Sequence, residues 1–159
     1  MNIKITDIEQ KTDIIYDRID KLRSSGYYLE AFYFFANILE VTLRDAVMCQ
    51  RDYLSEYLKL DGFCLNNDGQ KKIEEMTLGE LITQFKKYYK IDSQKLVSRL
   101  ENINGFRIKT VHNITKHDLV LLNKESDTLY TNNRDLILKL LQYCLWCIEK
   151  RHKLESNKT

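Results

Sequence analysis

Residues 27–47, which read YYLEAFYFFANILEVTLRDAV, decide the fold class, because they are apolar on almost every side at helical spacing. Two neighbouring apolar stripes run along this stretch: Tyr28, Phe32, Phe35 and Leu39, and Ala31, Phe34, Ile38 and Val41. A helix with apolar side chains over so wide an arc is usually central and packed on several sides. The sequence therefore predicts a long central helix over about residues 27–60.

Helical patterns also extend outward from this stretch in both directions. The chain holds no proline and only five glycines, which favours long helices over a strand-and-turn architecture. Apolar residues recur at helical spacing over about residues 7–23, after a cap at Thr77, after Asp92 or Ser93, and over about residues 133–153. Polar connections are predicted at 61–76 and 115–132. We therefore expect an all-α, up-and-down bundle of four to five helices, forming a single domain over residues 1–159 with its core at about 7–153.

One helix is predicted to break in its middle, at Asn104-Gly105. Glycine and asparagine disfavour a continued helix, so Asn102-Ile103-Asn104-Gly105 should interrupt or kink the helix that begins near Ser93. A fresh helix would then place Arg107 in its first turn. Unpaired backbone N–H groups and the helix dipole favour an anion at such a position.

Composition narrows the classes of function. The N-terminus lacks a basic region followed by an apolar run, and no stretch of about 18 uncharged apolar residues occurs, so we expect no signal peptide, no membrane contact and a cytoplasmic protein.

Cys144 and Cys147 form a C-x-x-C within LLQYCLWCIEK, where they follow a helical stripe. No second pair of metal ligands accompanies them, so we interpret them as core residues and expect neither metal nor cofactor.

Positive charge is concentrated in one segment, although the net charge of the chain is only +2. Residues 84–117 contain two acids, Asp92 and Glu101, and eight basic residues: Lys86, Lys87, Lys90, Lys95, Arg99, Arg107, Lys109 and Lys116. Such a concentration attracts phosphate backbones, although it is also compatible with a solvated helix face.

Arg107 and His112 lie inside this basic segment and form an R-x4-H pair. Histidine titrates near neutral pH, so it can take a proton from a ribose 2′-hydroxyl or give one to a leaving oxygen. Arginine can stabilise charge on phosphate oxygens through its planar fork of donors. Together the two residue types are sufficient to cut RNA without a metal. We expect Lys109, Asn113 and His117 to assist in substrate binding.

The spacing of the pair predicts a dimer. Five positions along a helix amount to a rotation of roughly 140° and a rise of about 7.5 Å, so one pair does not converge easily on one phosphate. Two pairs that meet across a two-fold axis would make a better site. A symmetric homodimer is therefore the natural inference if the pair is catalytic.

The sequence also resembles the HEPN superfamily (higher eukaryotes and prokaryotes nucleotide-binding). The resemblance rests on the segment from Leu96, Leu100 and Ile103 into Phe106-Arg107 and His112-Asn113, which is similar to the family's signature helix. Residues 30–43 are similar to its central helix, and residues 77–82 to a segment of bacterial members. Coverage extends over roughly residues 25–150, and the Arg–His segment is the specific motif.

The resemblance implies a metal-independent endoribonuclease in which Arg107 and His112 of two subunits line one composite cleft. It also implies a toxin or phage-defence effector, with RNA and an antitoxin or nucleotidyltransferase-like protein as partners. One departure is Ile108, where the family often carries a polar residue. It favours the alternative of an inactive HEPN-like module that binds a nucleotide, RNA or an antitoxin. A structural bundle with an accidental motif is the third hypothesis.

Overall fold

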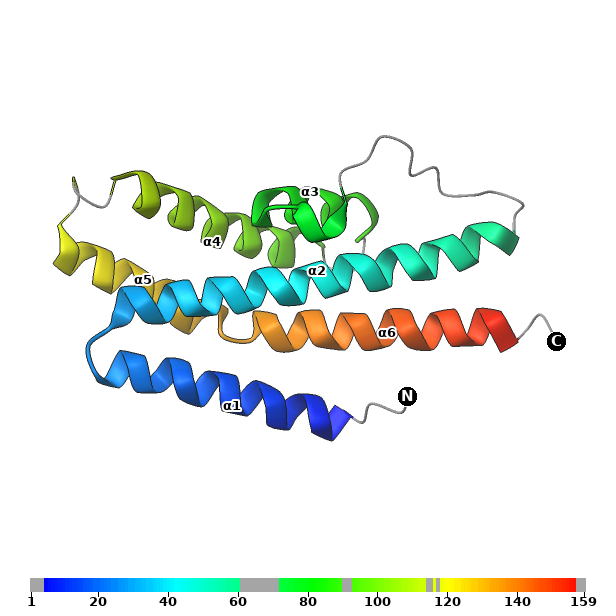
Figure 1. The fold of residues 1–159 in the computed structure, drawn as a ribbon, viewed down its shortest axis with the longest axis horizontal. Coiled ribbons are helices and arrows are strands. Elements are labelled where there is room, and N and C mark those ends of the chain that lie inside the picture. The colour runs from blue at the N-terminus through cyan, green and yellow to red at the C-terminus, as the bar shows by residue number, and fades with distance from the viewer. Residues whose placement is uncertain (1–4, 61–71, 90–92, 114–115, 117, 157–159) are drawn as a thin grey trace. The chain divides into compact units, whose positions relative to one another are not determined.

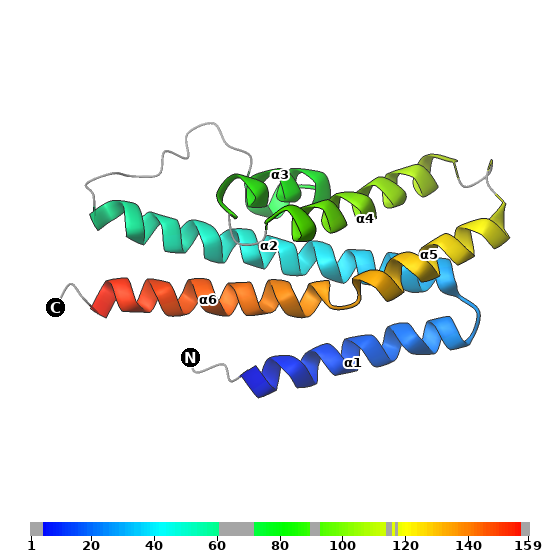
Figure 2. The ribbon, with the colours of Figure 1, turned by 180° about the vertical axis from the view of Figure 1, so that it is seen from behind.

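A computed structural model describes residues 5–60, 72–89, 93–113, 116 and 118–156, and these are helical almost throughout, with no strand among them. The helices, shown in Figures 1 and 2, are α1 (Ile5–Ser24), α2 (Tyr28–Leu60), the 3₁₀ helix η1 (Ile73–Glu75), α3 (Leu78–Tyr88), α4 (Ser93–Asn113), α5 (Leu119–Asn133) and α6 (Leu136–Ser156). The all-α class predicted from the sequence is confirmed. Among the described residues, no helix is both long enough and apolar enough to cross a membrane.

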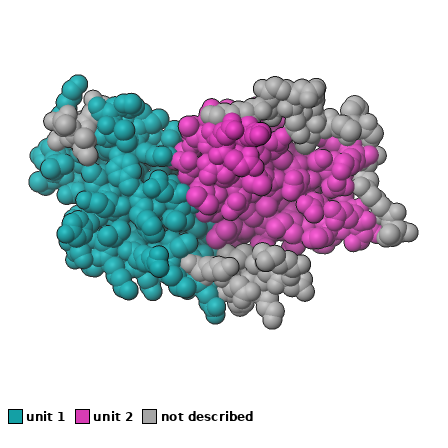
Figure 3. Space-filling view, viewed as in Figure 1, with its two compact units in different colours: residues 1–39, 94–138 teal, residues 40–93, 139–159 magenta. Residues whose placement is uncertain are grey.

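The chain divides into two compact units, which Figure 3 shows in different colours. Unit 1 comprises Met1–Leu39 and Gln94–Leu138, and unit 2 comprises Glu40–Ser93 and Lys139–Thr159. Each unit is therefore built from two separate stretches of chain. Helices α2 and α6 each contribute one part to unit 1 and the other part to unit 2.

The beginning of α2 supplies the aromatic core of unit 1. Phe32 and Phe35 are fully buried. The Phe32 ring packs edge-on against Phe106 of α4, with ring centroids 4.9 Å apart, and Phe35 packs in the same way against Tyr130 of α5 at 5.3 Å. The first predicted stripe is thus the buried one. The second is only partly buried, and Val41 at its end is 53% exposed.

Helix α1 ends at Ser24, close to the predicted end near residue 23, and is followed by Ser25 and Gly26. Gly26 has a φ of +86°, a backbone conformation that residues with a Cβ rarely adopt. The Gly26 N–H donates to the carbonyl of Arg23 (2.9 Å), and the Tyr27 N–H donates to that of Leu22 (3.0 Å). This pair of bonds is the Schellman motif, which turns the chain sharply from α1 into α2.

Unit 2 begins α3 with the predicted cap. The Glu80 carboxylate accepts from the backbone N–H of Thr77 (2.7 Å), and the Thr77 hydroxyl accepts from the N–H of Glu80, which completes a capping box. Just before it, Arg44 of α2 donates to the carbonyls of Ile73 (3.3 Å) and Met76 (3.1 Å). These bonds hold η1 and the start of α3 against α2.

Helix α4 is continuous from Ser93 to Asn113, so the predicted break at Asn104-Gly105 is wrong. A glycine inside a helix costs about 1 kcal/mol relative to alanine. Burial of one large apolar side chain contributes about 1.5–3 kcal/mol, and α4 buries Leu100, Ile103 and Phe106 around the glycine. Packing within unit 1 therefore outweighs the local preference.

Because α4 is continuous through Gly105, alanine should be tolerated at this position. Gly105 is exposed, and a Cβ built there would meet no atom within 4 Å. Gly105→Ala should therefore raise the free energy of unfolding by about 0.5–1 kcal/mol, measured as a higher urea midpoint. A loss of stability would mean that the helix needs a glycine conformation there. Ser98→Ala, at another exposed position of α4, is the matched control for composition.

Residues 119–133 form helix α5, whereas a polar connection was predicted over 115–132, so that prediction is wrong over most of its length. The buried positions of α5 are Leu122, Ser126, Tyr130 and Asn133, which follow helical spacing. Two of the four are polar. The Ser126 hydroxyl donates to the carbonyl of Asn123 (2.8 Å), and the Asn133 amide donates to that of Leu129 (2.7 Å). These local bonds make polar side chains tolerable in the core.

Candidate functional site

Arg107 and His112 both lie in the second half of α4, within unit 1. His112 is exposed in the last turn of the helix, and Arg107 is partly buried. Because α4 is continuous, the two side chains leave the helix roughly 140° apart. Within one chain they therefore do not share a face, as the spacing predicted.

The helix N-terminus proposed for Arg107 does not exist. α4 begins at Ser93, so Arg107 lies well inside the helix, where backbone N–H groups are already bonded to carbonyls one turn earlier. Any anion bound by Arg107 must be held by side chains. The prediction of a dipole-assisted anion site at this residue is wrong.

The backbone around Arg107 is anchored on its buried side. Phe106 packs on Phe32, as described above, and Thr110 is fully buried. The Thr110 hydroxyl lies 2.9 Å from the carbonyl oxygen of Phe106, and 2.5 Å from the hydroxyl of Tyr33 on α2. These contacts fix the rotation of α4 about its axis, and with it the directions in which Arg107 and His112 leave the helix.

Of the three predicted substrate-binding residues, the structure describes the side chain of Lys109 alone. The Lys109 ammonium lies 3.2 Å from the Glu125 carboxylate of α5, so substrate would have to compete with an existing ion pair. Asn113 is the last residue of α4, and its side chain is not among those described. His117 lies outside the described residues.

The basic segment is divided rather than gathered on one element. Lys86 and Lys87 are exposed on α3 in unit 2, whereas Lys95 and the residues after it belong to unit 1. Arg99 is engaged near the C-terminal end of α5, where its guanidinium donates to the side chains of Asn133 (2.8 Å) and Asp135 (3.2 Å). Unit 1 by itself therefore carries only part of the basic segment, and Arg99 within it is already bonded.

Exposed apolar side chains lie between Arg107 and His112 on α4 and at the start of α5, a feature that the sequence reading missed. Ile108 and Val111 on α4 are 51% and 59% exposed. At the start of α5, Leu119, Val120 and Leu121 are between 52% and 77% exposed. The Lys109–Glu125 ion pair shows that these parts of α4 and α5 lie beside each other in unit 1. Clusters of exposed apolar side chains mark surfaces that another molecule covers.

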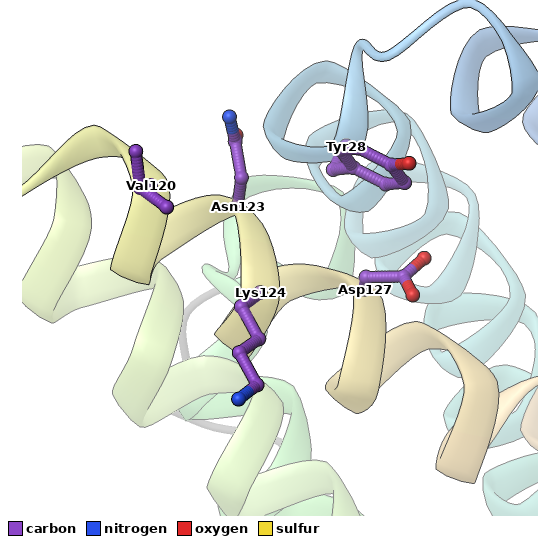
Figure 4. A pocket seen from close by; sticks show the side chains of 5 residues that line it. All are labelled: Tyr28, Val120, Asn123, Lys124 and Asp127. Carbon is purple, nitrogen blue, oxygen red and sulfur yellow. The ribbon is translucent and has the colours of Figure 1, made fainter.

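A shallow pocket of about 380 Å³ lies between the first turn of α2 and helix α5. In Figure 4 the Tyr28 ring lies beside Asn123 and Asp127, and Lys124 points the opposite way from Asn123. Val120 completes the lining. Asp127 accepts from Arg23 of α1 (2.7 Å), so its charge is already balanced. The sequence reading missed this pocket because it treated α5 as a connection; Asp118, which caps α5 by accepting from the Val120 N–H, was the available signal.

Among the side chains that the structure describes, no group of three or more histidines, cysteines, aspartates or glutamates is arranged to hold a metal ion. Comparisons with models of protein families, with curated proteins and with solved structures give no match to this chain.

Proposed function

We propose that this protein is a metal-independent endoribonuclease of the HEPN type, which acts as a homodimer. The observation that carries the proposal is the arrangement of the last two turns of α4. They present an exposed imidazole and a partly exposed guanidinium, and between these in sequence stand the exposed apolar side chains of Ile108 and Val111. A second copy of the same helix would cover the apolar residues and bring two Arg–His pairs together.

A symmetric dimer would bring together an arginine and a histidine that point apart within one chain. The Arg107 and His112 side chains of one helix diverge by roughly 140°, so they cannot both reach one phosphate directly. Across a two-fold axis, the arginine of one subunit can approach the histidine of its partner, because an isologous interface places residue i against residue j twice. The composite cleft would then hold two imidazoles and two guanidiniums.

The chemistry follows from these groups. One imidazole takes the proton of a ribose 2′-hydroxyl, and the 2′-oxygen attacks the adjacent phosphorus. The bond from phosphorus to the 5′-oxygen breaks, and the second imidazole gives that oxygen a proton. The guanidinium of Arg107 stabilises the charge that builds on the non-bridging oxygens. The products are a 2′,3′-cyclic phosphate and a 5′-hydroxyl. Cleavage requires a 2′-hydroxyl, so DNA is not a substrate.

The biological role follows from the resemblance. An RNase that needs no cofactor is active wherever its substrate is present, so a cell that makes it must restrain it. We propose that the protein is a toxin or phage-defence effector, held in check by an antitoxin or a nucleotidyltransferase-like partner.

The test combines cleavage with oligomeric state. The purified protein should cut single-stranded RNA in the presence of EDTA and sediment as a dimer. Val111→Asp, which places a charge on the proposed interface, should give a folded monomer with cleavage lowered at least about tenfold, because an unpaired charge in an apolar interface is strongly unfavourable. Ile14→Asp, at an exposed apolar position of α1, should change neither property. Full cleavage by a monomeric Val111→Asp protein would disprove the composite site.

Ile108 favours a second candidate function, a module that binds a nucleotide, RNA or an antitoxin without cutting. It is an exposed apolar residue directly after Arg107, at a position where the family that the chain resembles often carries a polar residue. Growth of cells that overexpress the protein separates the two functions, because an unrestrained RNase arrests growth and a binding module does not. RNA retained without cleavage in the EDTA assay would establish the module.

A further inference from the structure

Two cysteines from distant parts of the chain meet inside unit 2. Cys49 lies on α2 and Cys144 on α6, where the two helices are in contact: the Gln50 amide donates to the Tyr143 hydroxyl at 2.9 Å. The two thiols are close enough for each to shift the pKa of the other. In Figures 1 and 2 these parts of α2 and α6 run side by side. Cys144 is buried, whereas Cys49 is partly exposed, so solvent reaches one thiol of the pair. Both cysteines are unoxidised.

The pair is chemically asymmetric. The hydrogen bond with Cys144 lowers the pKa of the Cys49 thiol, despite partial burial and the nearby carboxylates of Asp52 and Asp45, and the Arg151 guanidinium acts in the same direction as the hydrogen bond. The same bond, together with burial, raises the pKa of Cys144. Thiolates, not thiols, react with oxidants. Cys49 is the less buried of the two and has the lower pKa, so it is the reactive member, and Cys144 is placed as the second thiol that resolves an oxidised Cys49.

Cys147 provides an internal comparison. It lies one turn beyond Cys144 on α6 and is fully buried. Burial raises the pKa of its thiol to about 11, so it remains protonated near neutral pH. The C-x-x-C of the sequence therefore does not act as a pair, because its first cysteine faces Cys49 on another helix.

We propose that Cys49 and Cys144 are an oxidation site that closes to a disulfide between α2 and α6 in the presence of a hydroperoxide. The Cys49 thiolate attacks one oxygen of hydrogen peroxide, the O–O bond breaks, and a sulfenic acid and hydroxide form. The sulfur of Cys144, which gives up its proton, then attacks the Cys49 sulfur, and the hydroxyl group leaves. In total the two thiols lose two electrons and two protons, and one hydrogen peroxide becomes two molecules of water.

Closure would change the stability of the chain. Positions 49 and 144 are far apart in sequence, so a covalent bond between them restricts the unfolded chain strongly. We expect the melting temperature to rise by about 10 °C on oxidation and to return on addition of dithiothreitol. The bond would join the two helices from which unit 2 is largely built.

The experiment uses the full chain with Cys64→Ser, so that Cys49, Cys144 and Cys147 are the only thiols. The protein is treated with hydrogen peroxide, the remaining thiols are alkylated, and the products are mapped by peptide mass spectrometry. The expected result is a chain that has lost two hydrogens and carries no disulfide to a second chain, with one cross-linked peptide pair joining Cys49 to Cys144 and one alkylated thiol at Cys147. A disulfide between Cys144 and Cys147, or between two chains, would overturn the proposal.

Variants distinguish the roles of the two thiols. Cys144→Ser should leave a sulfenic acid at Cys49 that dimedone traps, and Cys49→Ser should leave no trapped sulfenic acid. Cys147→Ser is the matched control and should form the cross-link as before. If serine at the buried position 144 unfolds the chain, the peptide map of the protein with all three thiols still tests whether Cys49 and Cys144 form the disulfide. Trapping at Cys147 as fast as at Cys49 would also overturn the proposal.

Discussion

His112→Ala is expected to lower the rate of RNA cleavage by about 10²–10⁴-fold, which is the usual contribution of a general acid or base. His112 is exposed at the end of α4, so its removal should leave the fold unchanged. Arg107→Ala should have an effect of similar size, because a side chain that stabilises transition-state charge contributes about 10²–10³-fold. Initial rates on a fluorescent single-stranded RNA in EDTA measure both.

The controls use the same residue types elsewhere on the chain. His152 is exposed on α6 and Arg18 on α1, and replacing either by alanine should leave the rate within about twofold of the unsubstituted protein. Arg107→Lys keeps the charge and loses the planar fork, so it should restore little of the activity. Equal cleavage by the His112→Ala and unsubstituted proteins would show that the imidazole of His112 takes no part in the reaction.

Mixing the two inactive proteins tests the composite site directly. If the arginine of one subunit acts with the histidine of its partner, a mixed dimer of Arg107→Ala and His112→Ala chains still holds one such pair, although it keeps only one of the two imidazoles. Exchange of subunits should then recover measurable cleavage from two preparations that have almost none. No recovery, with exchange verified by mass, would place both groups of each site in one chain.

Phe32→Ala should cause the largest loss of stability, about 3–5 kcal/mol of unfolding free energy. Phe32 is fully buried, and its ring packs edge-on against Phe106, one residue before Arg107. The substitution leaves a cavity under the half of α4 that carries the Arg–His pair. Urea unfolding followed by circular dichroism gives the free energy, and RNA cleavage should decline with it.

The matched control for Phe32 is an apolar residue outside the core. Ile14 of α1 is 59% exposed, so Ile14→Ala should change the free energy of unfolding by less than about 0.5 kcal/mol. A loss below about 1 kcal/mol for Phe32→Ala would show that the ring is not packed as described. The comparison isolates burial, because both substitutions remove a large apolar side chain from a helix.

The helices that the sequence predicted well are those whose core is apolar. Phe32 and Phe35 repeat at helical spacing and are buried, and Thr77 caps α3 as predicted. Helix α5 escaped detection because Ser126 and Asn133 occupy buried positions, and side chains that bond to nearby carbonyls hide the apolar period. The break at Gly105 was predicted from local preference, which cannot register the burial of Ile103 and Phe106.

The two residues of the candidate site could be predicted from the sequence, but the side chains around them could not. Arg107 and His112 could be named from residue chemistry and spacing, and α4 carries both. The ion pair of Lys109 with Glu125 could not be foreseen, because the glutamate belongs to the unrecognised helix α5. The exposure of Ile108 and Val111 was equally hidden, since an apolar residue in a helical pattern is assigned to the core by default.

The two units alternate along the chain, so neither unit is complete until a late stretch of the chain has been synthesised. Residues 1–39 are synthesised before the rest of unit 1, which lies at 94–138, after a stretch that belongs to unit 2. Until those later residues appear, Phe32 and Phe35 lack the rings of Phe106 and Tyr130 that cover them. A nascent chain of intermediate length therefore exposes the aromatic side chains of α2, and exposed apolar surface of this kind favours aggregation until unit 1 is complete.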